Sequence, residues 1–185
     1  MPARVERGVH AAGWRGVALP RTKVSDFLVF PVVEIDAEVW AERIEKGQGP
    51  ELDRSTLVIW ESWTADLGEM PPSPAVSIVG FISTATRPAE ALYALDSLAG
   101  YGAGLWITTG VRGPTAWTLS EFDVAGVGVV AERAGGCAVL VEGRRGPIAT
   151  ARRLASTRHK EEQLFGWALA TGYSPADAVS TTPMH

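Results

Sequence analysis

The chain contains a single cysteine, Cys137, and three histidines among its 185 residues. One cysteine excludes an internal disulfide and any metal site built from several thiolates. The motifs HExxH, GxSxG and CxxC are also absent, which excludes the usual signatures of zinc proteases, α/β-hydrolases and thiol oxidoreductases. Two of the histidines, His10 and His185, lie close to the chain ends. We therefore expect no metal and no cofactor, and the sequence favours a non-catalytic protein without excluding an enzyme.

Long hydrophobic runs are missing as well. The longest, residues 27–33 and 124–131, are much shorter than a membrane span, so we expect no membrane partner. Residues 1–20 contain no apolar stretch after a basic start, which argues against a secretory signal and, with the single cysteine, predicts a cytoplasmic location. Asparagine is absent and arginine outnumbers lysine 14 to 3. This bias is typical of a GC-rich coding genome, such as that of an actinobacterium or its phages.

Positive charge gathers towards the two ends of the sequence, and the middle is acidic. Residues 1–25 carry a net charge of +4 and residues 143–160 a net charge of +6, whereas residues 26–142 carry −11. The overall net charge of −4 hides this segregation, which raises local potentials that attract partners. Such a partner is either a phosphate-bearing molecule or the acidic middle of the same or a neighbouring subunit.

The first half of the chain reads as alternating strands and helices. Residues 26–35 are rich in β-branched and aromatic side chains and predict a strand, in which Pro31 favours an edge position or a bulge. Asp36 is expected to cap a helix over residues 37–46, with an apolar stripe that includes Ile44. Residues 56–63 (TLVIWESW) predict the second strand.

The same order then repeats. We expect a strand over residues 76–83, a helix over 87–99 capped by Thr86, and a strand over 105–109. Two successive β-α-β triples predict an α+β fold of the ferredoxin-like (split βαβ) class. Right-handed crossovers would place both helices on one face of a four-stranded antiparallel sheet.

The second half predicts an addition to this core. Residues 127–133 and 137–142 flank a tight turn and predict a β-hairpin, and Pro147 predicts the start of a long helix that runs towards Ala170. The expected organisation is a basic N-terminal arm (1–25), a ferredoxin-like core (26–110), a hairpin–helix extension packed on the core (111–171) and a tail (172–185).

The segment Gly143–Gly146 (GRRG) is the main candidate for an anion site. Free N–H groups at the start of the expected helix, together with Arg144 and Arg145, would suit a phosphate or a carboxylate. The P-loop pattern is absent, so a nucleotide site of that kind is excluded. The alternative is that two solvated arginines flank a tight turn.

Further basic residues continue along the expected helix: Arg152, Arg153, Arg158 and Lys160. A stripe of this kind neutralises phosphates, so a nucleic-acid partner stays open. Two observations favour an ordinary solvated face instead. The sequence pI is about 5.4, and Glu161 and Glu162 follow Arg158 at the spacing of helix-surface ion pairs.

Seven tryptophans are many for a chain of this length. Trp60 and Trp63 would point to opposite faces of the sheet if both lay in one strand, and a sheet covered on one face leaves the other free for a partner. Trp14 stands alone in an otherwise polar arm and also needs a place to dock. We interpret Trp14, Trp60 and Trp63 as a candidate interaction surface.

Three functional classes follow. The first is a non-catalytic interaction or assembly protein that binds itself or another protein, such as a phage or mobile-element subunit or an immunity-type protein. The second is a nucleic-acid-associated protein that uses residues 143–160. The third is an enzyme that acts on a phosphorylated or carboxylated small molecule, with Arg144 and Arg145 as the anion clamp. The charge segregation and the surplus tryptophans favour the first.

Overall fold

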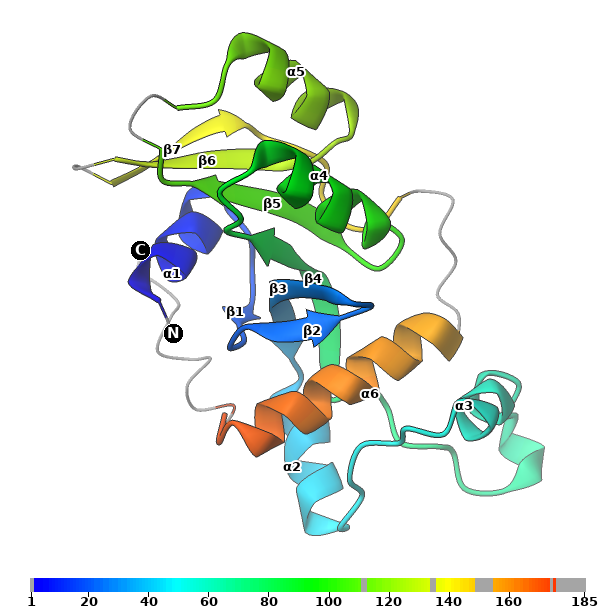
Figure 1. Ribbon diagram of the computed structural model, residues 1–185. Helices are drawn as coiled ribbons and strands as arrows, with labels where there is room; N and C mark the ends of the chain where they lie inside the picture. Colours follow the sequence, from blue (N-terminus) through cyan, green and yellow to red (C-terminus); the bar gives the residue numbers. More distant parts are fainter. Residues whose placement is uncertain (1, 111–112, 134–135, 149–154, 174, 176–185) are drawn as a thin grey trace. The chain divides into compact units, whose positions relative to one another are not determined.

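The computed structural model describes residues 2–110, 113–133, 136–148, 155–173 and 175 (Figure 1). The chain has a mixed α+β architecture and divides into two compact units, each made from two segments of sequence. Unit 1 comprises Met1–Val33 and Ile78–Ala151, and unit 2 comprises Glu34–Ser77 and Arg152–His185. No helix within the described ranges is both long and apolar enough to cross a membrane.

Unit 1 is built on a seven-stranded sheet in the order β1-β3-β4-β5-β6-β7, with β2 also paired to β3 (Figure 1). The strands β4, β5 and β6 run parallel, β7 is antiparallel to β6, and β1 and β2 are antiparallel to β3. The bounds are β1 Val17–Ala18, β2 Thr22–Val24, β3 Phe27–Ile35, β4 Val76–Ser83, β5 Ala103–Thr108, β6 Gly128–Arg133 and β7 Gly136–Val141.

Pro31 explains why two short strands, rather than one, pair with β3. It lacks an N–H donor, so it cannot complete a regular ladder with a neighbouring strand. β1 pairs with Val32 and Val33, and β2 pairs with residues 27–29, so the break between them lies opposite Pro31. The Pro31 carbonyl still accepts a hydrogen bond from the Leu19 backbone N–H, at 2.8 Å.

Three helices accompany this sheet: α1 (Ala3–Ala11), α4 (Pro88–Ser97) and α5 (Ala116–Val124). Val5 and Val9 of α1 are buried in one hydrophobic cluster with residues of β3, β4, β5 and β6, and Trp14 packs against that cluster. The segment 1–25, which carries a net positive charge, therefore contributes apolar side chains to the core of unit 1. The N-terminal charge lies on a segment that is anchored by its apolar residues.

Unit 2 contains α2 (Ala37–Glu45), α3 (Arg54–Glu61), a 3-10 turn at Ala65–Leu67 and α6 (Ala155–Ala170). Aspartates cap two of these helices. Asp36 accepts hydrogen bonds from the backbone N–H groups of Glu38 and Val39, which confirms the predicted cap of α2. Asp53 accepts from the N–H groups of Ser55 and Thr56 in the same way and begins α3.

The predicted strand over residues 56–63 is wrong, because residues 54–61 form α3. The β-branched run TLVIW favoured a strand, but the cap at Asp53 and the burial of Leu57 against unit 2 favour a helix. The ferredoxin-like arrangement is therefore not confirmed. The sheet orders β4, β5 and β6 in parallel instead of forming the expected four-stranded antiparallel sheet.

Other expectations divide between confirmed and wrong. The strands at residues 26–35, 76–83 and 105–109 and the hairpin formed by β6 and β7 are confirmed to within two residues at their ends. The long helix expected to run towards Ala170 is confirmed as α6 over Ala155–Ala170, but its expected start at Pro147 is wrong, because residues 145–147 form a bend. The cap of α4 is Arg87 rather than Thr86.

Gly80 on β4 provides a test of the packing in unit 1. A Cβ atom there would lie 2.4 Å from the Ala103 carbonyl oxygen and 2.7 Å from the Trp14 ring. We expect Gly80→Ala to lower the free energy of unfolding by about 1–3 kcal/mol, because the carbonyl of the adjacent strand cannot move away easily. Chemical denaturation followed by circular dichroism measures the loss.

Gly100→Ala is the matched control, because a Cβ at Gly100 would meet no atom within 4 Å. That variant should unfold at the same denaturant concentration as the native chain. Equal stability of the Gly80 and Gly100 variants would contradict the close packing of Trp14 and β5 around Gly80.

Candidate interaction site

The helix α6 places charged side chains in the interior of unit 2. Glu162 is 1% exposed, and Glu161 and His159 are also buried, although the sequence of this segment is polar all round. On α2, Arg43 is 1% exposed, whereas Ile44, expected to face the core, is half exposed. Buried charges require partners, so this region of unit 2 depends on specific pairing.

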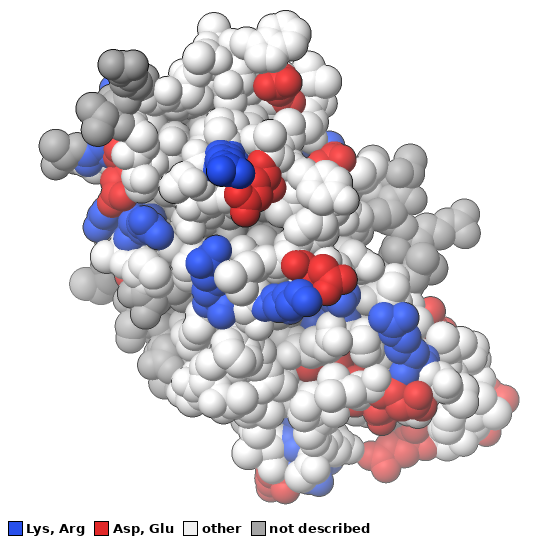
Figure 2. Space-filling model, viewed as in Figure 1, with Lys and Arg blue, Asp and Glu red and all other residues white. Residues whose placement is uncertain are grey.

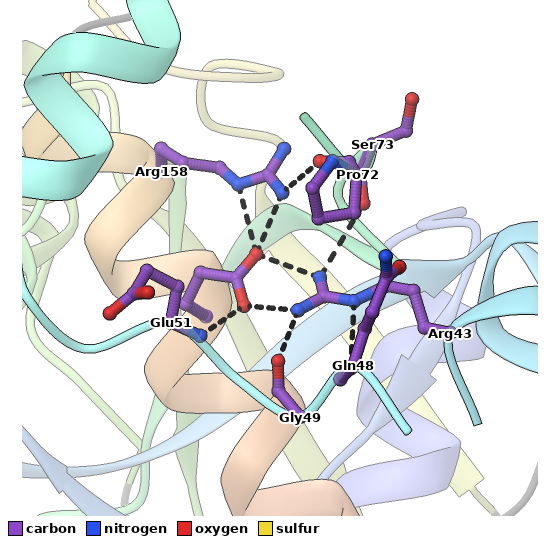
Figure 3. Close-up of polar contacts among 8 residues, drawn as sticks. Arg43, Gln48, Gly49, Glu51, Pro72, Ser73 and Arg158 are labelled. Atoms are coloured by element: carbon purple, nitrogen blue, oxygen red, sulfur yellow. Dashed lines mark hydrogen bonds and ion pairs between the residues drawn. The ribbon is translucent and has the colours of Figure 1, made fainter. Parts of the chain in front are cut away.

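Arg43 and Glu162 form a bidentate ion pair (Figure 3). Two guanidinium nitrogens of Arg43 donate to the two carboxylate oxygens of Glu162, each at 2.8 Å. Arg43 also donates to the backbone carbonyls of Gln48, Gly49 and Ser73, so all five of its N–H groups have an acceptor. The guanidinium further lies over the Phe165 ring, 4.5 Å from its centroid.

Glu162 also holds the second arginine and a loop. Arg158, one turn earlier on α6, donates from Nε to Oε1 of Glu162 at 2.9 Å, and the Glu51 backbone N–H donates to Oε2 at the same distance. Arg158 also donates from Nη2 to the Pro72 carbonyl, at 2.6 Å. This buried cluster of Arg43, Arg158 and Glu162 thereby ties the loop segments 48–51 and 72–73 to α2 and α6 (Figure 3).

Beside the buried cluster lies an open pocket of about 470 Å³. Trp60 and Leu57 of α3 line one side, Arg158 lines another, and the loop residues Met70–Pro74 close it. The Arg158 guanidinium lies 5.6 Å from the centroid of the Trp60 ring, within the range of a cation–π contact. The pocket therefore combines flat apolar walls with one cationic group.

The outer face of α3 is apolar and exposed. Val58 and Ile59 are 56% and 54% exposed, and Met70, which lines the pocket beside α3, is exposed to a similar extent. Segment 34–77 of unit 2 holds ten carboxylates and three basic groups, a net charge of −7. Figure 2 shows acidic side chains around α3 and its neighbouring loop, with basic side chains beside them. We call the exposed apolar side chains of Val58 and Ile59, with the carboxylates around them, the α3 surface.

The residues predicted to bind anions are divided between the two units. Arg144 and Arg145 belong to unit 1, where the buried Nε of Arg144 has no hydrogen-bond partner within the described part of the chain. Arg158 and Lys160 belong to α6 of unit 2, and Arg158 is engaged by Glu162. Arg152 and Arg153 lie outside the described residues.

The three predicted interaction tryptophans take different places. Trp14 packs on the core of unit 1, whereas Trp60 lines the pocket of unit 2. Trp63 follows the end of α3 and is half-buried, with an indole N–H that has no partner among the described residues. Sequence reasoning therefore placed Trp60 at a candidate site for the wrong reason, since it lies on a helix and not on a sheet face.

Sequence reasoning missed Arg43 altogether and treated Glu162 only as a surface ion-pair partner of Arg158. Arg43 follows Trp40 at helical spacing on the buried side of α2, but a charged residue at such a position is ordinarily taken as solvated. The available signal was the polar stretch inside a helix with apolar flanks, because a helix that is polar on every side needs partners other than water. That signal indicates buried pairing without identifying the partner.

Comparison of the chain with protein-family models, with curated proteins and with solved structures finds no match.

The ion pair can be tested by separating its partners. Arg43→Met and Glu162→Leu should each lower the free energy of unfolding by about 3–5 kcal/mol, because each leaves a buried charge unpaired. Glu162→Leu should be the more damaging, since it also removes the acceptor of Arg158. The double variant should lose less than the sum of the two single losses, as measured in a double-mutant cycle by chemical denaturation.

Glu42→Gln serves as the control, because it removes the exposed ion pair with Lys46 on the same helix. It should leave the denaturation midpoint almost unchanged. Additive losses in the cycle would show that Arg43 and Glu162 do not depend on each other.

His159 makes the stability of unit 2 sensitive to pH. Burial lowers the pKa of its imidazole below the usual value, and the charges of Arg54 and Lys160 lower it further, against an opposing interaction with the Leu52 backbone. The unfolded chain therefore takes up the proton first, so stability is full above a pH of about 6.5 and falls as the pH drops below it. His159→Gln should flatten this dependence.

The measurement is the denaturation midpoint of both proteins between neutral pH and the range where carboxylates begin to titrate. The informative quantity is the change with pH, so an overall loss of stability in the variant does not affect the conclusion. Identical pH profiles for the native chain and His159→Gln would show that His159 does not resist protonation in the folded state.

Proposed function

We propose that this chain is a non-catalytic interaction protein that assembles with further copies of itself. The observation that carries the proposal is the exposed apolar face of α3, set in the most acidic segment of the chain. A second copy of this chain is the partner that we propose, because unit 1 carries a basic surface that complements this acidic and apolar face.

The composition of α3 supports a covered rather than a solvated face. Val58 and Ile59 are β-branched, so they are poorer helix formers than the residues usually found on exposed helix surfaces. Ser55 lies three residues before Val58, and Ser62 lies three residues after Ile59. Both serines are exposed, and their small side chains leave the two apolar side chains unobstructed. Adjacent apolar side chains of this kind gain free energy when another surface removes them from water.

The charge around α3 determines which kind of protein surface can bind there. The net charge of −7 over residues 34–77 repels a second acidic surface and favours a basic one. Unit 1 offers such a surface on β2 and β3. Arg21 and Lys23 are exposed and two residues apart, and Lys23 pairs in register with Leu28, which is 53% exposed.

Lys23 and Leu28 share one face of the β2–β3 pair, because directly opposed residues lie on the same side, and Arg21 directly precedes β2 and is also exposed. Lys23 also forms an ion pair with Asp26, but both groups are exposed, so the pair is weak and can be exchanged for another carboxylate. We call these three residues the β2–β3 surface. It is basic and apolar where the α3 surface is acidic and apolar.

A contact between these two surfaces joins unlike parts of two copies. Such a head-to-tail contact leaves one free surface of each kind at the ends of every pair. The same contact can therefore repeat, which is the behaviour of an assembly subunit. The nucleic-acid alternative has less support, because Arg158, central to the predicted basic stripe, is engaged by Glu162.

The head-to-tail contact predicts complementation between two defective variants. Val58→Asp with Ile59→Asp disables the α3 surface, and Arg21→Glu with Lys23→Glu disables the β2–β3 surface. Each variant alone should be monomeric, whereas an equal mixture should form a complex of two chains, because each partner keeps one intact surface. Sedimentation velocity at low salt measures all three samples.

Val124→Asp is the control, since Val124 is 87% exposed and lies at the end of α5 in unit 1. That variant should associate like the native chain, and association of both should weaken as salt rises. A native chain that stays monomeric at high concentration, or a mixture of the two variants that stays monomeric, would contradict the proposal.

A further inference from the structure

The pocket of unit 2 contains a guanidinium with unused donors. Arg158 donates from Nε to Glu162 and from Nη2 to the Pro72 carbonyl, with Nη2 also in ion-pair contact with Glu162. Within the described part of the chain its Nη1 donates to no acceptor, and Figure 3 shows this nitrogen free of dashed lines. Because Arg158 lines the pocket, an acceptor held there can reach these N–H groups.

The buried cluster also carries an excess of positive charge. Two guanidinium groups, those of Arg43 and Arg158, share the single carboxylate of Glu162, which is already saturated by Arg43, Arg158 and the Glu51 N–H. Burial lowers the pKa of the Arg158 guanidinium, and the charge of Arg43 contributes in the same direction, while the carboxylates of Glu162 and Glu161 oppose them. A ligand carboxylate beside Arg158 would accept from the N–H groups that the cluster leaves unused.

The walls of the pocket suit a flat ring. Trp60 lines the pocket, and Pro71, Pro72 and Pro74 supply rigid apolar surface from the loop. Offset stacking on an indole and contact with proline rings both favour planar, unsaturated groups. A volume of about 470 Å³ falls within the range of small-molecule sites.

We propose that this pocket binds a small aromatic monocarboxylate, with the carboxylate on Nη1 of Arg158 and the ring between Trp60 and the prolines. The proposed self-association rests on Val58 and Ile59, neither of which lines this pocket. Glu61 also lines the pocket, and its exposed carboxylate disfavours ligands with two negative charges, such as phosphate monoesters.

The test is a titration of the native chain with benzoate, followed through the indole N–H signal of Trp60 in the NMR spectrum. Trp60→Phe identifies that signal by its disappearance. Benzamide, which has the same ring without the charge, and acetate, which has the charge without the ring, should each bind at least about tenfold more weakly than benzoate. Inorganic phosphate should bind more weakly than benzoate because of Glu61.

Three variants test which side chains contribute to benzoate binding. Arg158→Lys keeps the charge but loses the planar fork, and should weaken benzoate binding about tenfold or more. Glu61→Gln leaves the buried cluster intact and should tighten binding of both benzoate and phosphate. Arg54→Gln is the matched control, because it removes a positive charge from α3 without touching the pocket lining, and should leave benzoate affinity unchanged.

Two results would overturn the proposal. The first is a Trp60 signal that benzoate does not shift, or that benzoate and benzamide shift with equal affinity. The second is benzoate affinity that Glu61→Gln leaves unaltered, a result that stays informative even if Arg158→Lys fails to fold. The Val58→Asp, Ile59→Asp variant should bind benzoate normally, so failure of this site and failure of self-association are distinguishable.

Discussion

The ion pair between Arg43 and Glu162 is the interaction on which unit 2 depends. A guanidinium and a carboxylate that are each 1% exposed are tolerable only because every donor of Arg43 and both oxygens of Glu162 are engaged. Apolar side chains of similar volume could pack there with comparable stability, but they would not specify which loops lie against the two helices. The pair therefore contributes specificity of arrangement more than net stability.

That specificity extends to the surface. The carbonyls of Gln48, Gly49 and Ser73 are held by Arg43, and the Pro72 carbonyl is held by Arg158, so the proline loop that closes the pocket is positioned from below. A proline-rich loop donates few backbone hydrogen bonds of its own, and its carbonyls are the groups left to anchor it. The buried arginines therefore hold the proline loop in the conformation that forms the pocket.

Sequence patterns predicted the elements whose signals are local. The strand at β3 and the cap at Asp36 follow from β-branched composition and from a side chain placed to accept helix N–H groups. The TLVIW segment was misjudged because strand propensity and the Asp53 cap point in opposite directions, and packing of Leu57 decides between them. Trp60 could be proposed from its residue type. The pairing of Arg43 with Glu162 could not, because the two residues are 119 apart and the polar stretch of α6 does not identify a partner.

Native-state hydrogen exchange at the Glu51 amide tests most directly whether the buried pair organises the site. This N–H belongs to a loop between helices, and its only assigned acceptor among the described residues is Oε2 of Glu162, at 2.9 Å. We expect it to exchange as slowly as amides in the interior of α6 in the native chain, and as fast as an open loop after Arg43→Met. Rapid exchange of the Glu51 amide in the native chain, beside slow exchange in α6, would contradict it.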